Sequence, residues 1–439
     1  MIVMNIELNT LWVLLATAMV VFMEGGFSLL EAGFVRAKNA VNVTMKVFVD
    51  LTFGTLAFYV IGFHLMFGED VAGLIGKVFG AMPDQGPGGL PLAAYLLFQI
   101  AFAIAVASII SGAVAERMKF SAYMLVTVIV CGVLYPISGH WIWSEHGWLA
   151  RLGMKDFAGS TAIHAMGGFA ALALAQLLGP RQNRFNGENR SNREFAPSNL
   201  PLASAGAFIL WFGWFGFNAG STLSAGDARL STIALNTFLA AAAGGASTIL
   251  AYLIRKKPVD PGMVINGSLA GLVAITAGCA FVTETAAVII GLIAGILVIF
   301  ATDWVERLKI DDPVGAVAVH GFNGVLGTVA VGLFDIQAGW ITTGQTRLLL
   351  VQLLGAVAVA AWGYLSAYAA GKLLQVSVGI RVSPEEEQRG LDLSIHGMAA
   401  YHAEESHAGV EERTEPAVQK QPQPVHANVL VSVQEGTSL

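Results

Sequence analysis

Long apolar stretches, separated by short polar segments, recur along the chain as far as about residue 373. A helix that crosses a bilayer core ~30 Å thick needs ~20 apolar residues, and each stretch is long enough. The stretches lack the two-residue alternation of a barrel wall, so helices are the predicted spanning elements. The predicted spans are residues 9–32, 42–67, 92–114, 120–142, 159–178, 200–220, 230–254, 263–281, 285–303, 313–334 and 348–373. This pattern predicts an all-α polytopic membrane protein with eleven transmembrane helices in residues 1–373.

Composition excludes several classes of protein. Of the 439 residues, 55% are hydrophobic and 12% are charged, whereas soluble globular chains carry about 25% charged residues. The net charge of −6 and the absence of a long basic run argue against a nucleic-acid partner. Cys131 and Cys279 both lie inside apolar stretches. Neither a disulfide framework nor a cysteine metal site is therefore predicted, and no cofactor is expected.

Loop charges predict the orientation of the chain, because Lys and Arg accumulate in short cytoplasmic loops. The loops after odd-numbered spans carry 13 of these residues, and the loops after even-numbered spans carry 5. We therefore expect the N-terminus outside, the C-terminus in the cytoplasm, and the protein in the cell's inner (plasma) membrane. The first span is longer than the core of a signal peptide, so a retained helix is expected rather than a cleaved leader.

Two segments of the sequence echo each other. Asp156 precedes His164 by eight residues, and Asp312 precedes His320 by the same interval. In both copies a glycine follows the Asp after three residues and another follows the His after four. The copies lie five predicted spans apart, so the second must cross the membrane in the opposite direction. This predicts an inverted repeat of helices 1–5 and 6–10, followed by helix 11, and such folds hold their substrate near the midplane. The predicted units are residues 9–178, 200–334 and 348–373.

The two histidines are predicted to lie deep in the membrane. Each Asp suits a helix N-cap, and Pro313 suits a first helical turn. At 1.5 Å per residue, His164 would lie ~12 Å from the outer face and His320 ~12 Å from the inner face. The chain has 50 glycines, many of them inside the spans, which predicts closely packed helices. These patterns alone indicate a polytopic transporter or channel.

Several motifs together resemble the Amt/Mep/Rh ammonium transporter superfamily, on its Amt side. They are Glu31–Asn39 (EAGFVRAKN), Gly112–Ser121 (GAVAERMKFS), Asp156-Phe-Ala-Gly with His164, Gly213–Ser221 (GWFGFNAGS), and Asp311-Asp-Pro with His320. The resemblance covers about residues 8–405. It implies a homotrimer of eleven-helix protomers in the lipid bilayer, each with its own narrow pore for ammonium uptake.

The resemblance also implies roles for eight residues. They are Trp143, Ser221 and Phe98 at an outer recruitment site, Asp156 as a buried carboxylate supporting this vestibule, Phe102 and Phe217 as a gate, and His164 and His320 as pore-lining residues. The chemistry suits these roles, because a Trp face attracts a desolvated cation by ~2 kcal/mol or more and a Ser hydroxyl can accept a hydrogen bond. The segment Ser144-Glu-His-Gly147 departs from the family pattern, which has a glycine run at this place in many members, at the mouth of the vestibule.

The mechanism we expect is recruitment of NH4+, its deprotonation at the gate, and conduction of NH3 along the imidazoles, with or without the proton. Burial favours proton loss, since it can lower an ammonium-type pKa by up to roughly 3–5 units. Potassium, which has no proton to release, would be rejected. The alternatives are an ammonium sensor with little flux that acts through its tail, and an Rh-like channel for NH3 or CO2. No enzyme is expected, since the sequence has no HExxH motif and no third metal ligand beside the histidines.

Four further ionisable residues lie in the first two predicted spans. Glu24 and Glu31 share a face of the first span, and Asp50 and His64 lie in the second. Ionisable groups inside a membrane are candidates for function, but mutual pairing at a helix or subunit contact is the alternative we favour for these four.

The C-terminal segment is more polar. Residues 374–405 resemble the family's cytoplasmic regulatory tail, which implies a possible PII-type signal protein as partner. Residues 406–439, with few aromatics and many acids, are predicted to be a disordered extension. The tail histidines lack metal-ligand spacing and are expected to be solvated; they are His396, His402, His407 and His426.

Overall fold

Helices form nearly all the regular structure in residues 2–185 and 195–401, the part of the chain that the computed structural model describes. The long helices are α1 (Ile2–Phe34), α5 (Leu92–Ala113), α9 (Met166–Leu178), α10 (Leu200–Gly220), α11 (Leu230–Ile254), α12 (Pro261–Ile275), α13 (Glu284–Arg307), α14 (Asn323–Phe334) and α16 (Arg347–Ser377). Two further spans are interrupted by π-helical turns: one contains α2 (Ala40–Val49), α3 (Thr55–Ala57) and α4 (Phe63–Phe67), and the other contains α6 (Phe120–Ile129) and α7 (Tyr135–Trp143). The short elements are α8 (Trp148–Leu152), α15 (Trp340–Thr343), α17 (Pro384–Arg389) and the antiparallel pair β1 (Asp70–Val71) and β2 (Ile75–Gly76).

The membrane-spanning, all-α class is confirmed. Within the described residues, 10 helical segments are long and apolar enough to cross a membrane, and they coincide with ten of the predicted spans. The span predicted at residues 263–281 is α12, which has 15 residues and is followed by turns. An eleventh crossing at this helix therefore stays a prediction.

Local sequence explains where several helices begin. The Asn199 side chain accepts a hydrogen bond from the Leu202 backbone N–H and caps α10. Asp260 caps α12 in the same way, directly before Pro261. Side-chain acceptors at these positions satisfy backbone N–H groups that have no partner in the first turn, and Pro loses no helical hydrogen bond there. The helix boundaries thus follow from residues that the sequence displays.

Close helix contacts occur where glycines face each other. A Cβ atom on Gly206 of α10 would lie 2.5 Å from the Gly26 carbonyl oxygen of α1. A Cβ on Gly168 of α9 would lie 2.1 Å from the backbone nitrogen of Gly321. Small residues allow such approach in lipid, where van der Waals packing holds helices together. The glycines therefore allow the backbones of the two halves of the chain to pack closely.

The two echoing segments have the same local structure. The Asp156 carboxylate accepts hydrogen bonds from the backbone N–H groups of residues 159, 161 and 162. The Asp312 carboxylate accepts from those of residues 315, 316 and 317. Gly159 and Gly315 both have a positive φ, of 119° and 81°, which suits glycine. A π-helical turn carrying the histidine follows in each copy, Ser160–Ala165 and Val317–Phe322. This equivalence supports the proposed repeat.

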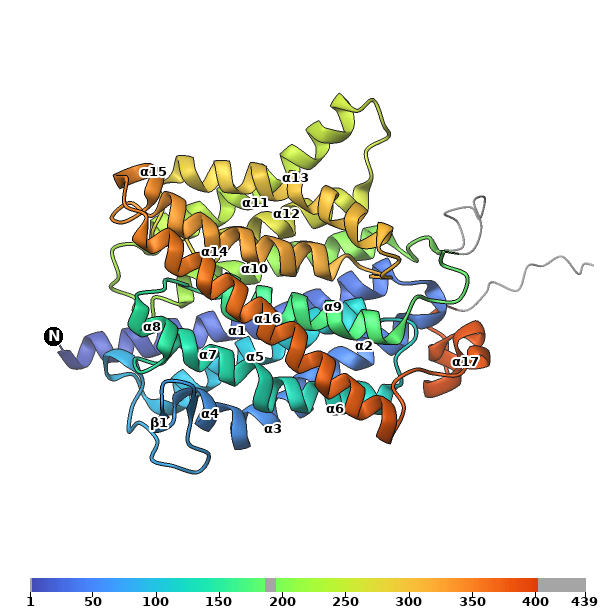
Figure 1. The fold of residues 1–439 in the computed structure, drawn as a ribbon, viewed down its shortest axis with the longest axis horizontal. Helices are drawn as coiled ribbons and strands as arrows, with labels where there is room; N and C mark the ends of the chain where they lie inside the picture. Colours follow the sequence, from blue (N-terminus) through green and yellow to red (C-terminus); the bar gives the residue numbers. More distant parts are fainter. Residues whose placement is uncertain (1, 186–194, 402–439) are drawn as a thin grey trace, which may run out of the picture. The chain divides into compact units, whose positions relative to one another are not determined.

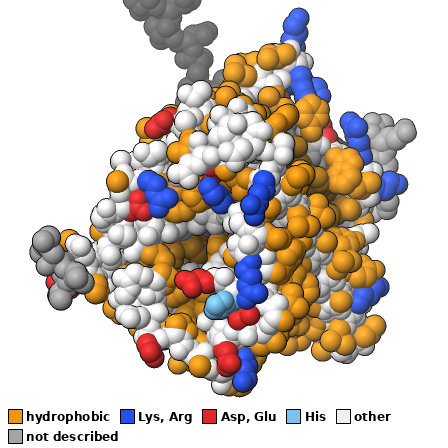
Figure 2. Space-filling view, turned by 60° about the vertical axis from the view of Figure 1, so that its left-hand side comes forward, with side chains coloured by type: hydrophobic (Ala, Val, Ile, Leu, Met, Phe, Trp, Pro, Cys, Tyr) orange, Lys and Arg blue, Asp and Glu red, His pale blue; other side chains and the backbone are white. Residues whose placement is uncertain are grey.

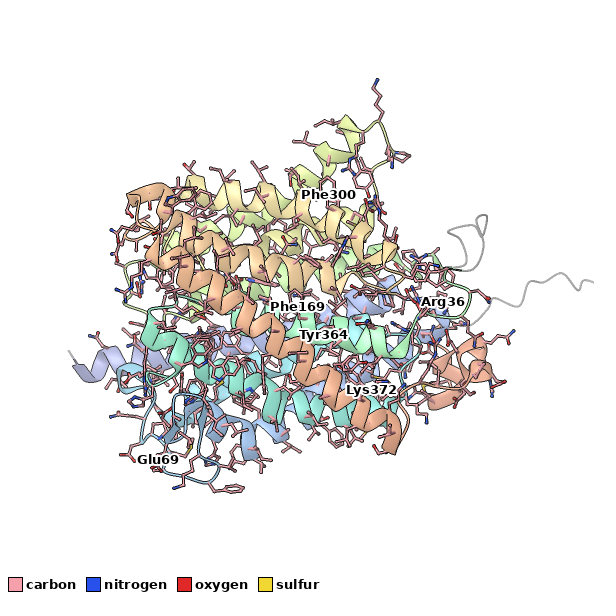
Figure 3. All side chains as sticks on the ribbon, viewed as in Figure 1. Arg36, Glu69, Phe169, Phe300, Tyr364 and Lys372 are labelled. Atoms are coloured by element: carbon pink, nitrogen blue, oxygen red, sulfur yellow. The ribbon has the colours of Figure 1, made fainter. Side chains whose placement is uncertain are left out.

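The short elements between the spans lie at the two opposite ends of the long helices. Figure 1 shows β1, α8 and α15 at one end and α17 at the other, with α16 crossing its neighbours obliquely. Figure 3 places Glu69 at the first end and Arg36 at the second. Following the predicted orientation, we call these the outer end and the inner end.

The described part of the C-terminal segment packs against the inner end. The Asp392 carboxylate accepts hydrogen bonds from the backbone N–H groups of Val41 (3.0 Å) and Asn42 (2.8 Å), at the start of α2. The backbone N–H of Leu391 donates to Asn39 Oδ1 at 2.9 Å. These contacts hold residues 391–392 against the start of α2. The predicted extension at 406–439 lies outside the described residues.

Candidate functional site

A cavity of about 190 Å³ lies at the outer end of α5. Its lining residues are Pro87, Tyr95, Phe98, Gln99, Phe102, Trp143, Phe157, Ser221 and Leu223. The structure thus brings together the three predicted recruitment residues, which come from α5, α7 and the end of α10. The cavity combines aromatic faces with a few oxygen atoms, which suits a small cation.

Hydrogen bonds hold the walls of this cavity. Trp143 Nε1 donates to the backbone oxygen of Asp156 at 2.8 Å. Ser221 Oγ donates to the Phe217 carbonyl at 2.8 Å, so its own lone pairs can accept. The Asp156 side chain does not line the cavity; it binds backbone N–H groups at the start of the pore segment. Asp156 is therefore placed to orient Trp143 and the His164 segment.

Aromatic rings close the inner side of the cavity. The Phe102 ring lies 4.5 Å from the Phe217 ring and 4.5 Å from the Phe98 ring, between centroids. Phe102 is 2% exposed and Phe217 is 0% exposed. The predicted gate pair is thus in direct ring contact, and it separates the outer cavity from the histidines.

The two histidines meet directly behind this gate. His164 Nδ1 and His320 Nδ1 are 3.2 Å apart, and the rings are stacked with centroids 5.2 Å apart. The His164 ring also stacks on Phe217 at 5.6 Å. One imidazole nitrogen must donate and the other accept. His164 Nε2 has no hydrogen-bond partner among the described residues, so the pair keeps a polar atom available to a passing molecule.

Three site residues escaped the sequence analysis. Trp214 stacks on His164 at 5.3 Å, and its Nε1 donates to Thr276 Oγ1 at 2.9 Å. Gln99 lines the outer cavity, and its Oε1 has no partner in the described part of the chain. The Phe27 ring lies 6.4 Å from that of His320, between ring centroids. Gln99 gave a signal, as an amide within an apolar stretch one residue after Phe98.

A second, small cavity of about 20 Å³ lies beyond His320. Phe27, Glu31, Ser108 and His320 are among its lining residues. The described residues thus form a series: outer cavity, phenylalanine gate, histidine pair and inner cavity.

The segment that departs from the family pattern, Ser144–Gly147, contributes to a larger outer hollow of about 840 Å³. Ser144, Glu145 and His146 line it together with Glu69 and Asp70, and so does Trp143. Figure 2 shows acidic and basic side chains and a histidine gathered around a hollow on the face turned forward. Clefts lined with carboxylates raise the local concentration of cations. Trp143 thus lies between this acidic hollow and the smaller cavity.

The other intramembrane polar residues divide into two groups. Glu24 and Asp50 both contact the hydroxyl of Ser108, and Glu31 accepts a hydrogen bond from Ser111 on the same helix. His64 lies apart from this contact, with its ring 5.6 Å from that of Phe79. Within residues 2–185 and 195–401, no three His, Cys, Asp or Glu side chains are arranged to hold a metal ion.

The chain is similar to known proteins in sequence and in structure. Ammonium transporter Amt2 of Archaeoglobus fulgidus is 43% identical over 418 residues, covering 90% of this chain and 89% of that protein. Among solved structures, a protein described as "Sensor Amt Protein" superposes with a TM-score of 0.85 at 40% identity, covering 90% of this chain and 100% of that one. Candida albicans Mep2 superposes with a TM-score of 0.79 at 29% identity, covering 87% of each chain.

These relatives and the apolar helices identify a multi-pass protein of the plasma membrane. The sequence profile described as Ammonium Transporter Family matches residues 11–401. The chain therefore belongs to the ammonium transporter family.

Proposed function

We propose that this protein takes up ammonium by binding NH4+ in the outer cavity, removing its proton at the phenylalanine gate and passing NH3 along the histidine pair. The 3.2 Å contact between His164 and His320, directly behind the ring contact of Phe102 and Phe217, carries this proposal. A buried polar pair behind an aromatic closure suits a small polar molecule better than a hydrated ion.

The outer cavity supplies what NH4+ needs. The ion has four N–H donors, and Ser221 Oγ and the unpartnered Gln99 Oε1 are acceptors in the cavity wall. The Trp143 ring adds a cation–π attraction of ~2 kcal/mol or more for a desolvated cation. Asp156 supports this geometry through its carbonyl bond to Trp143.

The gate provides the reason for deprotonation. Phe102 and Phe217 offer no charge and no hydrogen-bond acceptor, so an ion between them loses hydration without compensation. Ammonia avoids this cost, because it is neutral, and the imidazole nitrogens beyond can donate to it and accept from it. Potassium has no neutral form, which accounts for selectivity.

Transport current in liposomes tests the proposal. The double variant His164→Ala with His320→Ala should lose ammonium selectivity or flux, whereas Phe208→Ala, which changes a 70% exposed ring on α10, should behave as the wild type. A current that tracks ammonium with unchanged selectivity in the double variant would contradict the mechanism.

A sensor with little flux is the second candidate. The similarity to the "Sensor Amt Protein" and the attachment of Asp392 to α2 favour it, since occupancy of the pore could alter the tail through α2. Uptake of methylammonium by a host that lacks its own ammonium transporters separates the two. Wild-type uptake at the background level would favour the sensor.

Assembly and regulation are further parts of the proposal. The family resemblance supports a homotrimer with one pore in each protomer, and a PII-type protein as a partner at the inner end. Native mass spectrometry of the purified protein tests the trimer: a monomer in mild detergent would contradict it. Co-purification with and without residues 374–405 tests the partner.

A further inference from the structure

Four ionisable side chains are buried together on the inner side of the histidine pair. Glu24 and Glu31 lie on α1, Lys46 lies on α2, and Asp50 begins the π-helical turn that follows α2. Their exposed fractions are 4%, 1%, 1% and 0%. None of the four belongs to the outer cavity or the gate.

Hydroxyl groups connect these side chains. Ser108 Oγ lies 2.7 Å from Glu24 Oε2 and 3.1 Å from Asp50 Oδ2. Ser111 Oγ donates to Glu31 Oε2 at 2.7 Å, and Lys46 Nζ donates to the Ser111 carbonyl at 2.8 Å. A serine has one hydroxyl hydrogen, so Ser108 donates to one of these two carboxyl groups at a time. Asp50 also accepts hydrogen bonds from the hydroxyl groups of Tyr123 and Thr127, so the Ser108 hydrogen is available to Glu24.

Each of the two glutamates has one buried carboxyl oxygen that makes no hydrogen bond with the described residues. Glu24 Oε1 and Glu31 Oε1 have no hydrogen-bond partner in residues 2–185 and 195–401. A buried acceptor without a partner loses its hydration and gains nothing in return. Such an atom is a place where a donor can bind.

Glu31 lines the cavity of about 20 Å³ that lies next to His320. A cavity needs about 10–15 Å³ to hold one water molecule, so this one has room for a single molecule of the size of water or ammonium. Ser108 supplies a hydroxyl oxygen to its wall, and Phe27 supplies an aromatic ring. Most of the remaining wall is aliphatic.

The charges around this cavity favour a cation. Three carboxyl groups, those of Glu24, Glu31 and Asp50, stand against two cations, Lys46 and the nearby Arg117. Glu116 is paired with Arg36 and Arg181. Arg117 donates its hydrogen bonds to backbone carbonyls. A buried excess of negative charge is costly unless protons or a cation neutralise it.

We propose that Glu31 forms a second ammonium-binding position, on the inner side of the histidine pair. In this position Glu31 Oε1 and Ser108 Oγ accept hydrogen bonds from the ion, and the Phe27 ring faces it. The inference rests on the proposed function, because the molecule that arrives past His320 is ammonia.

The arriving ammonia is protonated at this position. Its lone pair forms an N–H bond with the carboxyl proton of Glu31 while the O–H bond of that carboxyl breaks, which leaves an ammonium ion beside a carboxylate. When the ion leaves, a proton from the cytoplasmic solution restores the carboxyl.

Titration calorimetry of the full-length protein with ammonium chloride tests the binding position. The wild type should bind two ammonium ions per protomer, and Glu31→Gln should bind one, at the outer cavity. The loss of a charged acceptor should weaken the inner position about tenfold or more. Glu7→Gln, at an exposed position of α1, is the matched control and should bind two.

Infrared difference spectra report the proton directly. Adding ammonium chloride to the wild type should remove a protonated-carboxyl band, and Glu31→Gln should lack this change. Ser108→Ala, which leaves the Ser111 bond to Glu31 intact, gives a second variant if Glu31→Gln does not fold; it should weaken the inner position. Two ions bound by either variant with wild-type affinity, or an unchanged carboxyl band in the wild type, would overturn the inference. Failure of the proposed function appears separately, as unchanged transport in the double histidine variant.

Discussion

His164 Nδ1 and His320 Nδ1 lie 3.2 Å apart although the two residues are 156 positions apart in the chain. The contact depends on the close approach of two backbones, since Gly168 lies against Gly321 and Gly324 lies against Ala165. Each histidine lies in a π-helical turn. In each copy the turn follows a glycine whose backbone N–H donates a hydrogen bond to the preceding aspartate carboxylate. The geometry of the pair is thus set by backbone packing between the two copies.

Gly168→Ala should therefore destabilise the protein. The new Cβ would lie 2.1 Å from the Gly321 backbone nitrogen, which cannot move aside as a side chain could. Overpacking of this kind costs about 1–3 kcal/mol or more, so the thermal midpoint of the purified protein should fall. Gly25→Ala is the control, because nothing lies within 4 Å of its Cβ position, and it should melt at or above the wild-type temperature.

Trp143→Leu should weaken ammonium recruitment. It removes the aromatic face of the outer cavity, which is worth ~2 kcal/mol, and should raise the ammonium concentration for half-maximal uptake about thirtyfold. Trp141→Leu is the matched control, because Trp141 packs on Trp148 and Trp362 and does not line the outer cavity. Equal effects of the two substitutions would show that Trp143 acts in packing alone.

Phe102→Ala combined with Phe217→Ala should admit potassium. The two rings are in contact at 4.5 Å and close the inner side of the outer cavity. Without them the ion need not shed all its water to reach the histidines, so potassium flux into liposomes should rise above that of the wild type. Phe215→Ala changes a ring of the same helix that lies against Phe238, and should leave potassium excluded. A double variant that still excludes potassium would place selectivity elsewhere.

Much of this site could be predicted from the sequence, because each predicted feature is a pattern within one continuous stretch of the chain. The ten confirmed spans follow from the length of apolar stretches, and the histidine pair follows from two equal Asp-to-His intervals. Trp214 and Phe27 could not be selected, since the chain has 9 Trp and 25 Phe and only helix rotation decides which rings face the pore.

The buried carboxylates show the same limit. The sequence places Glu24, Glu31 and Asp50 inside predicted spans and suggests that they pair. That Glu24 and Asp50 meet at Ser108, while Glu31 lines the small cavity beside His320, depends on the register between α1, α2 and α5. No pattern within one helix encodes the register between helices.

Acid should destabilise the inner end. Arg181 donates to both carboxylate oxygens of Asp311, at 2.8 and 2.9 Å, and to Glu116 at 2.6 Å. Burial raises the pKa of both carboxyl groups, but the neighbouring arginines lower it by more. Arg181 holds the pKa of Asp311 below its ordinary value of 3.8. Arg181 and Arg36 together hold the pKa of Glu116 below its ordinary value of 4.5.

The sign follows from linkage. A carboxyl whose pKa is depressed in the folded state stabilises the fold fully above its unfolded pKa, and this contribution is lost as the pH falls through the folded pKa. The thermal midpoint should therefore be insensitive to this cluster above about pH 4.5 and fall at lower pH. Asp311→Asn should lower the midpoint at neutral pH and reduce its dependence on acid, whereas Asp84→Asn, at an exposed position, should do neither. An unchanged acid dependence in Asp311→Asn would exclude the cluster as its source.

Asp392→Asn should release the C-terminal segment from the inner end. Its carboxylate accepts N–H bonds from Val41 and Asn42 at the start of α2, where the helix dipole also favours a negative charge. An amide keeps one acceptor oxygen but loses the charge, at a cost of about 1–2 kcal/mol. Limited proteolysis of the purified protein should then cut residues 378–391 several-fold faster than in the wild type.

Truncation after residue 405 is the control for this variant, since it removes only sequence beyond the contacts of Asp392. Methylammonium uptake should be nearly unchanged by the truncation, and the cleavage rate at 378–391 should stay at the wild-type value. A large loss of uptake would refute the division of the tail into a regulatory part, 374–405, and an extension, 406–439. If Asp392→Asn alters uptake while the truncation does not, regulation acts through the start of α2, the helix that carries Lys46 to Ser111 and so to Glu31.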